Sequence, residues 1–577
     1  MTRVDPITRQ VIRNALRAAA GEMQASLVKT AHNPLLYEVQ DFGMVLTNRF
    51  GELIAEGSGL PGFLACLPPT IKSGRSVIGA ENFRDGDVVL TNEPDDTGTH
   101  ISDTVLYTPV FYRGELVAFA AVMAHWADIG GITPSGWCPY STSLHQEGMI
   151  FSHNKLFDGG DLNRELLRFI LRNVRFPGLV EGDLNAKIAC CRTGAARYLA
   201  LCERYGAELV EEAMLEAFAL AERRMRAEIR AIPDGTYRAE GALDHDGVVL
   251  ERPRSVAVAV TVEGEELTVD WNGTSEVAKG PVNHPLVGTA ALCATVLKSL
   301  TTPDDATNEG HLRPLVVKAP PDTLVSARYP APCDSYGYAA ELIIHLVIKA
   351  LAQAVPERCP AATYQMAAFN LVRDDPRFGR PFIYGEPLDG GGGAFPHDDG
   401  PSGIMFLGNG DAPNTPVEIV EARYPVLVTR YTFNPEHRGV GRFRGGYGVI
   451  RDYRILEDHI YLQTSTENNR HPMWGLEGGG DAGETVVVIN EGTPRQVTLD
   501  DRVTDFGPFG PGDTISFRTA NGGGWGSPED RDIAKIAQDV RNGLLTVEAA
   551  HRLYRVDRGE LERELERLHG PGRKGFS

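Results

Sequence analysis

Two short histidine–aspartate pairs stand close together in this sequence. The first is His100 with Asp103, in GTHISDTV, and the second is His125 with Asp128, in MAHWADIGG. Neutral imidazole and carboxylate groups are the usual protein ligands of Zn²⁺, Mn²⁺ and Fe²⁺. A single pair of this kind is more often structural, because polar loop residues commonly cap turns. If the fold brings the two pairs together, we give a metal site and a structural role equal weight.

The elements around these pairs indicate that they do meet. The segments TVLYTPVFY and ELVAFAAVMAH flank the dipeptide RG, which is typical of a β-hairpin. His100 and Asp103 then lie in the loop that enters the first strand, and His125 and Asp128 lie in the loop that leaves the second. These two ends are adjacent in an antiparallel hairpin. Asp41 begins an earlier strand and could reach the same end of the sheet, and Asp128 could instead orient a ligand from a second shell.

The rest of the chain predicts an α+β protein. We expect a β-rich, multilayer core with hairpins, several long helices and a small C-terminal helical appendage. Helices are expected from Asp5 to Pro34, across 183–232 with a break at Tyr205–Gly206, at 286–301 and within 530–570. The expected parts are an N-terminal metal-site domain with long helices (1–235), a glycine-rich mixed α/β domain (236–529) and a C-terminal helical segment (530–577).

The composition excludes several classes of protein. Hydrophobic residues make up 42% and charged residues 23% of the 577 residues, which is ordinary for a soluble globular protein. The net charge of −20 argues against nucleic acid and anionic membranes as partners. No apolar run is long enough to span a bilayer. The eight cysteines are scattered without a CxxC motif, which predicts reduced thiols and a cytoplasmic location.

The sequence offers no convincing nucleotide site. GSGLPG, at 57–62, has the formal spacing G-x-G-x-x-G after a strand. A dinucleotide site needs a helix that begins within this motif, in a parallel βαβ unit. Pro61, Pro68 and Pro69 are expected to disrupt such a helix, and the preceding strands form a hairpin. We therefore interpret this segment as a turn.

Several ordered blocks resemble the hydantoinase B/oxoprolinase family. GDVVLTNEPDDTGTHISDTVLYTPVF is similar to the family's first signature, and AHWADIGGITPSG is similar to its second. Further blocks follow in the family's order: NEGHLRPL, NTPVEIVEARYPVLVTRY, GVGRFRGGYGVIRDY, HPMWGLEGG and NGGGWGSPEDRD. The resemblance runs from about residue 5 to about residue 535.

The resemblance implies a subunit of an ATP-dependent enzyme. Family members open hydantoins, lactams or 5-oxoproline, and related subunits belong to acetone and acetophenone carboxylases. It implies a hydantoinase A-type partner that binds ATP and phosphorylates the substrate, with two copies of each subunit. Carried over by position, one divalent metal, Zn²⁺ or else Mn²⁺ or Fe²⁺, would be held by Asp41, His100, Asp103 and His125, with Asp128 in the outer shell.

Three functions remain open from the sequence. The first is the metal-dependent hydrolytic subunit of a cyclic amide hydrolase, with Glu147 or His145 in proton transfer. The others are a ketone carboxylase subunit and a non-catalytic assembly subunit. Family members usually have histidines where this chain has GLPGFLACLP, and many have basic residues where it has YEVQD. Both departures make the pocket less polar and favour a small apolar ring, such as a simple lactam, over charged 5-oxoproline.

Overall fold

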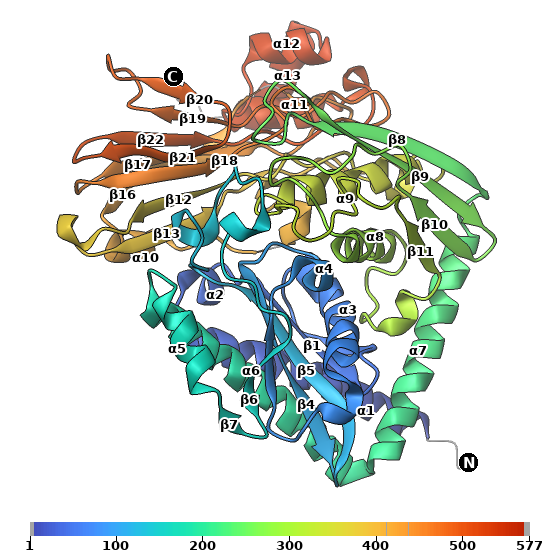
Figure 1. Ribbon diagram of the computed structural model, residues 1–577. Helices are drawn as coiled ribbons and strands as arrows, with labels where there is room; N and C mark the ends of the chain where they lie inside the picture. The colour runs from blue at the N-terminus through green and yellow to red at the C-terminus, as the bar shows by residue number, and fades with distance from the viewer. Residues whose placement is uncertain (1–4, 411, 437, 570–577) are drawn as a thin grey trace.

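The computed structural model describes residues 5–410, 412–436 and 438–569 (Figure 1). It confirms the predicted α+β class, since helices and several separate sheets alternate along the chain. The three-part division of the chain remains a proposal. No helix within these ranges is both long and apolar enough to cross a lipid bilayer. All eight cysteines are buried and free.

The N-terminal part is built on a seven-stranded antiparallel sheet. Its order is β2-β1-β5-β4-β3-β6-β7. The strands are β1 (Phe42–Asn48), β2 (Leu53–Glu56), β3 (Val88–Thr91), β4 (Asp103–Tyr112), β5 (Glu115–His125), β6 (Asn154–Asp158) and β7 (Asp161–Leu162). The predicted hairpin is β4–β5, and it lies at the centre of this sheet.

Helices cover both faces of the sheet. Helices α1 (Pro6–Thr30) and α6 (Pro177–Tyr205) pack on one face, and α3 (Pro61–Ile78) packs on the other (Figure 1). Because side chains alternate along a strand, β5 serves both cores. Ala120 and Val122 join the core under α1 and α6, whereas Ala121 and Met123 join the core under α3. This alternation decides on which face each site residue projects.

Helix α3 corrects one sequence prediction. The prolines at 68 and 69 were expected to prevent a helix after the Gly57–Gly62 segment, which is wrong: α3 begins at Pro61 and continues through both. A proline inside a helix costs about 3 kcal/mol. Burial of Phe63, Leu67 and Ile71 against the sheet offsets this, at about 1.5–3 kcal/mol for each side chain. The strands before α3 are an antiparallel hairpin, so the segment is not part of a parallel βαβ unit.

A second sheet follows the long helices. The predicted break at Tyr205–Gly206 is confirmed, because Gly206 adopts φ +82° between α6 and α7 (Ala207–Arg230). The sheet, in the order β11-β10-β9-β8, consists of β8 (Gly235–Leu243), β9 (Arg254–Glu263), β10 (Glu266–Asp270) and β11 (Leu315–Lys318). Helix α8 (Leu286–Thr301), as predicted, and α9 (Gly337–Leu351), which was not predicted, pack with it.

The glycine-dense region is β-rich, as expected. One sheet contains β12 (Ala368–Arg373), β13 (Phe382–Pro387), β18 (Ile460–Ser465) and β21 (Val503–Phe509). The other contains β16 (Val426–Asn434), β17 (Gly448–Ile455), β19 (Val486–Ile489), β20 (Val497–Leu499) and β22 (Thr514–Arg518). They share one core, in which the rings of Phe369 and Phe517 stack at 4.4 Å. A two-stranded sheet of β14 (Gly390–Gly391) and β15 (Ser402–Ile404) lies beside them.

The C-terminal helical appendage is also confirmed. It comprises α11 (Ile533–Arg541), α12 (Val547–Tyr554) and α13 (Arg558–His569), which share a small apolar core. The shorter helices elsewhere are α2 (Pro34–Tyr37), α4 (Pro94–Thr97), α5 (Arg164–Arg172) and α10 (Val417–Arg423).

Candidate metal centre

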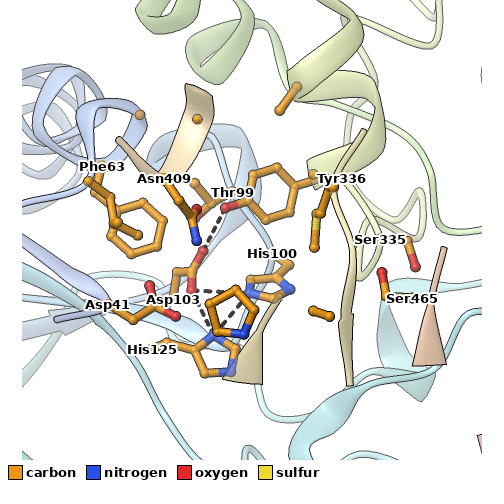
Figure 2. A pocket seen from close by; sticks show the side chains of 18 of the residues that line it. Asp41, Phe63, Thr99, His100, Asp103, His125, Ser335, Tyr336, Asn409 and Ser465 are labelled. Carbon is orange, nitrogen blue, oxygen red and sulfur yellow. Dashed lines mark hydrogen bonds and ion pairs between the residues drawn. The ribbon is translucent and has the colours of Figure 1, made fainter. Parts of the chain in front are cut away.

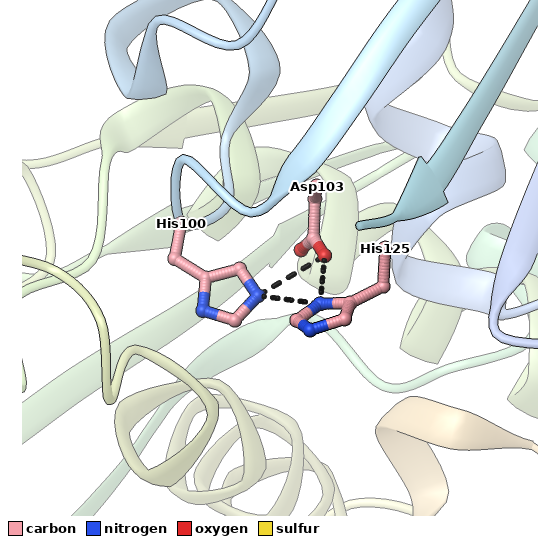
Figure 3. Close-up of side chains that lie close together, drawn as sticks. All are labelled: His100, Asp103 and His125. Atoms are coloured by element: carbon pink, nitrogen blue, oxygen red, sulfur yellow. Dashed lines mark hydrogen bonds and ion pairs between the residues drawn. The ribbon is translucent and has the colours of Figure 1, made fainter. Parts of the chain in front are cut away.

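The β4–β5 hairpin brings the two histidine–aspartate segments together. Asp103, the first residue of β4, lies directly opposite His125, the last residue of β5. Both share the face of Val105 and Met123, the face that α3 covers. His100 reaches the same place from the loop before β4 (Figure 3). The sequence-based prediction that the two ends of this hairpin meet is thus confirmed.

Three ligand-type atoms converge at this point. The Nε2 of His100 and the Nδ1 of His125 each lie 3.0 Å from Oδ1 of Asp103. The two nitrogens are 3.2 Å apart (Figure 3). Two imidazole nitrogens and a carboxylate oxygen form a donor set that suits Zn²⁺, Mn²⁺ or Fe²⁺. The residues present therefore fit the divalent metal that the resemblance implies.

Two further residues orient these ligands. The Nδ1 of His100 donates to the backbone carbonyl of Asp334 at 2.9 Å, which leaves Nε2 directed at the other ligands. The hydroxyl of Tyr336 donates to Oδ2 of Asp103 at 3.1 Å (Figure 2). Partners of this kind fix the tautomer and direction of metal ligands. Neither residue was predicted from the sequence. The run CDSY before an apolar segment marks them as polar, but it does not show that they reach the hairpin.

Burial and neighbouring charges set the ionisation of the cluster. Burial alone would lower the pKa of His100, but Asp103 and Asp334 outweigh it and raise the pKa to about 9. Burial also opposes ionisation of Asp103, yet the two histidines hold the pKa of this carboxyl well below its usual range. Burial raises the pKa of Asp41 and of Asp334 to about 6. Asp103 is therefore an anion at neutral pH, as a carboxylate ligand must be.

Asp41 lies beside the cluster but outside the group of three. It directly precedes β1, and its backbone carbonyl accepts from the N–H of His125 at 3.3 Å. Its side chain lines the same pocket as His100 and His125 (Figure 2). The group whose ligand atoms all lie within 4.8 Å of one another is His100, Asp103 and His125. The role of Asp41 as a fourth ligand remains a prediction.

Asp128 is engaged elsewhere. Its carboxylate accepts from the N–H of Gly130 and from Nη1 of Arg175, both at 3.2 Å, and also from the backbone N–H of Arg175. Both carboxylate oxygens are thereby occupied. These contacts order the loop after β5 and give no support to the predicted outer-shell role.

Neither residue predicted for proton transfer lines the pocket around the cluster. His145 is exposed, with Nε2 3.0 Å from the hydroxyl of Tyr329. Glu147 is buried, and its Oε1 accepts from Ser141 Oγ at 2.6 Å and from the Cys333 N–H at 2.9 Å. Burial, together with Asp334, raises the pKa of Glu147 to about 8. The contacts of Glu147 indicate that it supports the segment leading to Asp334.

The Glu147→Gln variant tests this interpretation. Glutamine keeps the carbonyl oxygen that accepts both hydrogen bonds, so we expect kcat to change only a few-fold. A residue that transfers a proton contributes about 10²–10⁴-fold. Steady-state kinetics of the assembled enzyme measure the difference. A fall of a hundredfold or more, without loss of thermal stability, would restore Glu147 as the proton donor.

The pocket beside the cluster combines apolar walls with acidic and neutral polar side chains; the neutral ones include Thr99, Asn370, Asn409 and Ser465. Its apolar walls include Leu35, Leu60, Phe63, Leu292, Met366 and Phe406. Its acidic residues are Asp41, Asp103, Asp334, Glu341 and Glu386. No lysine or arginine occurs among the described residues that line it. The walls come from α3, from the segment around α9 and from the C-terminal sheets, so the pocket lies where the N-terminal sheet meets the rest of the chain (Figures 1 and 2).

The sequence of this chain matches a known protein family and several of its members. Residues 5–528 match the model of the family described as hydantoinase B/oxoprolinase. A protein assigned as the B-type subunit of a D-/L-hydantoinase, from Pseudomonas sp. (strain NS671), is 32% identical over 569 residues, covering 95% of both chains. The beta subunit of the caprolactamase of Pseudomonas jessenii is 30% identical over 568 residues, covering 96% of this chain and 97% of that one.

Two solved structures share the fold. The crystal structure of ATP-dependent caprolactamase from Pseudomonas jessenii superposes with a TM-score of 0.87, at 28% identity and 96% coverage of both chains. A nucleotide-free acetone carboxylase structure superposes with a TM-score of 0.86 at 18% identity, covering 99% of this chain and 84% of that one. The second likeness concerns the fold alone.

Proposed function

Because the chain belongs to the hydantoinase B/oxoprolinase family, we propose that it is the metal-dependent hydrolytic subunit of an ATP-dependent cyclic amide hydrolase. The observation that carries this proposal is the convergence of His100, Asp103 and His125 at one end of an apolar pocket. Asp41 would complete the ligand set. A bound Zn²⁺, Mn²⁺ or Fe²⁺ would supply Lewis-acid activation of water at neutral pH.

The protein's own residues would prepare the site for this chemistry. The Asp334 carbonyl accepts from Nδ1 of His100, so a bound metal would displace the proton on Nε2, and Tyr336 holds the second oxygen of Asp103. The walls formed by Phe63, Leu292 and Phe406 would bind the hydrocarbon part of a ring and exclude water. With no lysine or arginine among its described lining, the pocket offers a carboxylate no permanently charged partner. This favours an uncharged lactam over 5-oxoproline.

The proposal includes a partner that uses ATP. The designations of the relatives as B-type and beta subunits support a second subunit, which we propose to be of the hydantoinase A type in a two-plus-two assembly. An amide carbonyl is a weak electrophile. Phosphorylation of its oxygen by the partner, which converts ATP to ADP, would give an activated imidate phosphate. Water would then add to the carbon, and the C–N bond would break as the nitrogen takes up a proton, leaving an acyl phosphate. A second water would hydrolyse this acyl phosphate to the carboxylate of the open product and free phosphate.

Reconstitution with such a partner tests the proposal. We expect ADP release to be stimulated by an uncharged lactam such as caprolactam, with one ring-opened amino acid formed per ATP. Pretreating this chain with a strong chelator should abolish ring opening, and Zn²⁺ or Mn²⁺ should restore it. 5-Oxoproline should be a much poorer substrate.

Other outcomes would replace the proposal. ATP turnover that requires bicarbonate and a ketone, without a response to lactams, would assign a carboxylase subunit. Lactam opening by the partner alone, together with the absence of stoichiometric metal in this chain, would assign an assembly subunit without catalytic function.

A further inference from the structure

We infer that Lys187 is a positioning residue that holds the two ligand-bearing strands at the spacing the metal requires. The inference rests on the metal site proposed above. Lys187 lies in α6, on the far side of the N-terminal sheet from the pocket, and its side chain is fully buried. It is therefore placed to act on the ligands through the backbone.

The ammonium group of Lys187 bridges β4 and β5. Its Nζ donates to the carbonyl of Thr104 at 2.7 Å and to the carbonyl of Ala124 at 3.0 Å, and it also contacts the Thr104 hydroxyl. Thr104 and Ala124 are opposite each other in the hairpin register. The next pair in that register is Asp103 and His125. One side chain thus fixes the strand separation one residue away from two metal ligands.

The alternation of side chains puts Lys187 and the ligands on opposite faces. Asp103 and His125 project toward α3 and the pocket, together with Val105 and Met123. The Thr104 hydroxyl projects the other way, toward α6 and Lys187. Lys187 touches neither the pocket nor a ligand atom. The charge of Lys187 also acts on Asp103 through space. Removing that positive charge would by itself strengthen binding of a cation, so a loss of metal affinity in a neutral variant points to the positions of the two strands.

Burial of Lys187 carries an energetic cost that its contacts must offset. Moving an ammonium group out of water costs several kcal/mol unless its surroundings compensate. Its Nζ has three oxygen acceptors, none of which is a carboxylate, and burial lowers the pKa of Lys187 to about 7. Asp183, one turn earlier in α6, accepts from the N–H groups of His32 and Asn33 and acts on Lys187 through its charge, without a hydrogen bond. A methionine of similar length could fill this space without the cost. Lysine differs from it by the three directed bonds to the hairpin and by a cation–π contact, since Nζ lies 5.5 Å from the centroid of the Trp126 ring.

Zn²⁺ binding by Lys187→Met in the full chain tests the inference. Loss of a group hydrogen-bonded to a metal ligand typically weakens metal binding by about 10–100-fold. Lys187 bonds the residues next to the ligands, so we expect a loss at the lower end of this range, about tenfold, in competition with a chromogenic chelator. The rise in Tm that saturating Zn²⁺ produces should shrink in parallel. If Lys187 only ties α6 to the sheet, Tm falls equally with and without Zn²⁺ and the affinity is unchanged, which would overturn the inference.

Two further variants keep the test decisive. Thr104→Val removes one acceptor of Lys187 and keeps the shape of the side chain. It should weaken Zn²⁺ binding several-fold, and it can be measured even if Lys187→Met does not fold. An unchanged Zn²⁺ affinity would count against the positioning role of Lys187. Cys191→Ala is the control, because Cys191 lies one turn further along α6 and contacts the Leu106 carbonyl at 3.5 Å; its affinity should match the unmodified protein. Failure of the unmodified protein to bind Zn²⁺ would overturn the metal site itself, whereas normal binding with an unchanged Lys187→Met overturns only the role of Lys187.

Discussion

Asp103→Asn will lose both its metal and its activity. Oδ1 of Asp103 is the atom toward which His100 and His125 both point, each at 3.0 Å. Asparagine has the same shape but no charge, so it is a far weaker ligand for a divalent cation. Since loss of outer-shell partners alone weakens metal binding by about 10–100-fold, we expect loss of this direct ligand to weaken it at least about a hundredfold. Elemental analysis after gel filtration and kcat of the assembled enzyme measure the two effects.

A matched control for this variant is Asp95→Asn. Asp95 lies in α4, shortly before the ligand loop, and accepts from the backbone N–H of Tyr329 at 3.1 Å. Asparagine retains that acceptor, so metal content and kcat should stay near those of the unmodified protein. Stoichiometric metal and full activity in Asp103→Asn would refute the assignment of this cluster as the metal centre.

Glu341→Gln will change how stability depends on pH. Glu341 is buried in α9, where burial raises its pKa from 4.5 to about 8. Its Oε1 accepts from the Gly408 N–H at 2.6 Å, and its Oε2 has no hydrogen-bond partner among the described residues. An unfolded chain ionises this group near pH 4.5, whereas the folded protein keeps the proton up to about pH 8. The folded state therefore binds more protons in this window, and its stability falls as pH rises through it.

The expected change in stability follows from the pKa shift of Glu341. Above pH 8 the cost to the folded state approaches about 5 kcal/mol, and glutamine, which is neutral in both states, removes it. With an unfolding entropy of about 2.1 cal/mol/K per residue, the Tm advantage of the variant should grow by roughly 3–4 °C between pH 5 and pH 8.5. Scanning calorimetry at pH 5 and pH 8.5 measures the Tm of both proteins. The difference in Tm between variant and unmodified protein removes the contribution of all other ionisable groups.

A second buried glutamate provides the contrast. Glu386 pairs with Nη1 of Arg451 at 3.0 Å, so Glu386→Gln leaves a buried cation without its partner and should lower Tm. A Tm difference between Glu341→Gln and the unmodified protein that stays constant from pH 5 to pH 8.5 would show that Glu341 ionises in the folded protein as it does in the unfolded chain.

The ligand cluster could be predicted from sequence because its determinants are local. The Arg113–Gly114 turn pairs Phe111 with Leu116, and a β-bulge next to Val110 shifts the pairing by one residue, which places Asp103 opposite His125. The similar spacing of His125 and Asp128 does not give the same geometry. His125 ends a strand, and the chain beyond it is free to turn, so Asp128 meets Arg175 rather than the ligands. Equal spacing gives equal geometry only where the backbone conformation is also equal.

The orienting residues could not be predicted because their positions depend on long-range packing. Asp334 and Tyr336 precede α9, whose side chains are buried on nearly every side. Such a helix has no polar face, so its amphipathic signal is weak. Its position against the hairpin depends on packing with α8 and the second sheet, which no local pattern records. In α3, likewise, tertiary burial overrides the preference of two prolines.

The separation of the ligands from the residues that orient them also sets an order in time. Asp334 follows His100 by 234 residues, and at about 5–20 residues per second it is synthesised roughly 10–50 s later. During that interval a nascent hairpin carries both histidines and Asp103, but neither the Asp334 carbonyl nor the Tyr336 hydroxyl. The metal-binding side chains are therefore synthesised before the residues that orient them. The site can reach its final geometry only after the ribosome has passed Tyr336, which lies beyond the midpoint of the 577-residue chain.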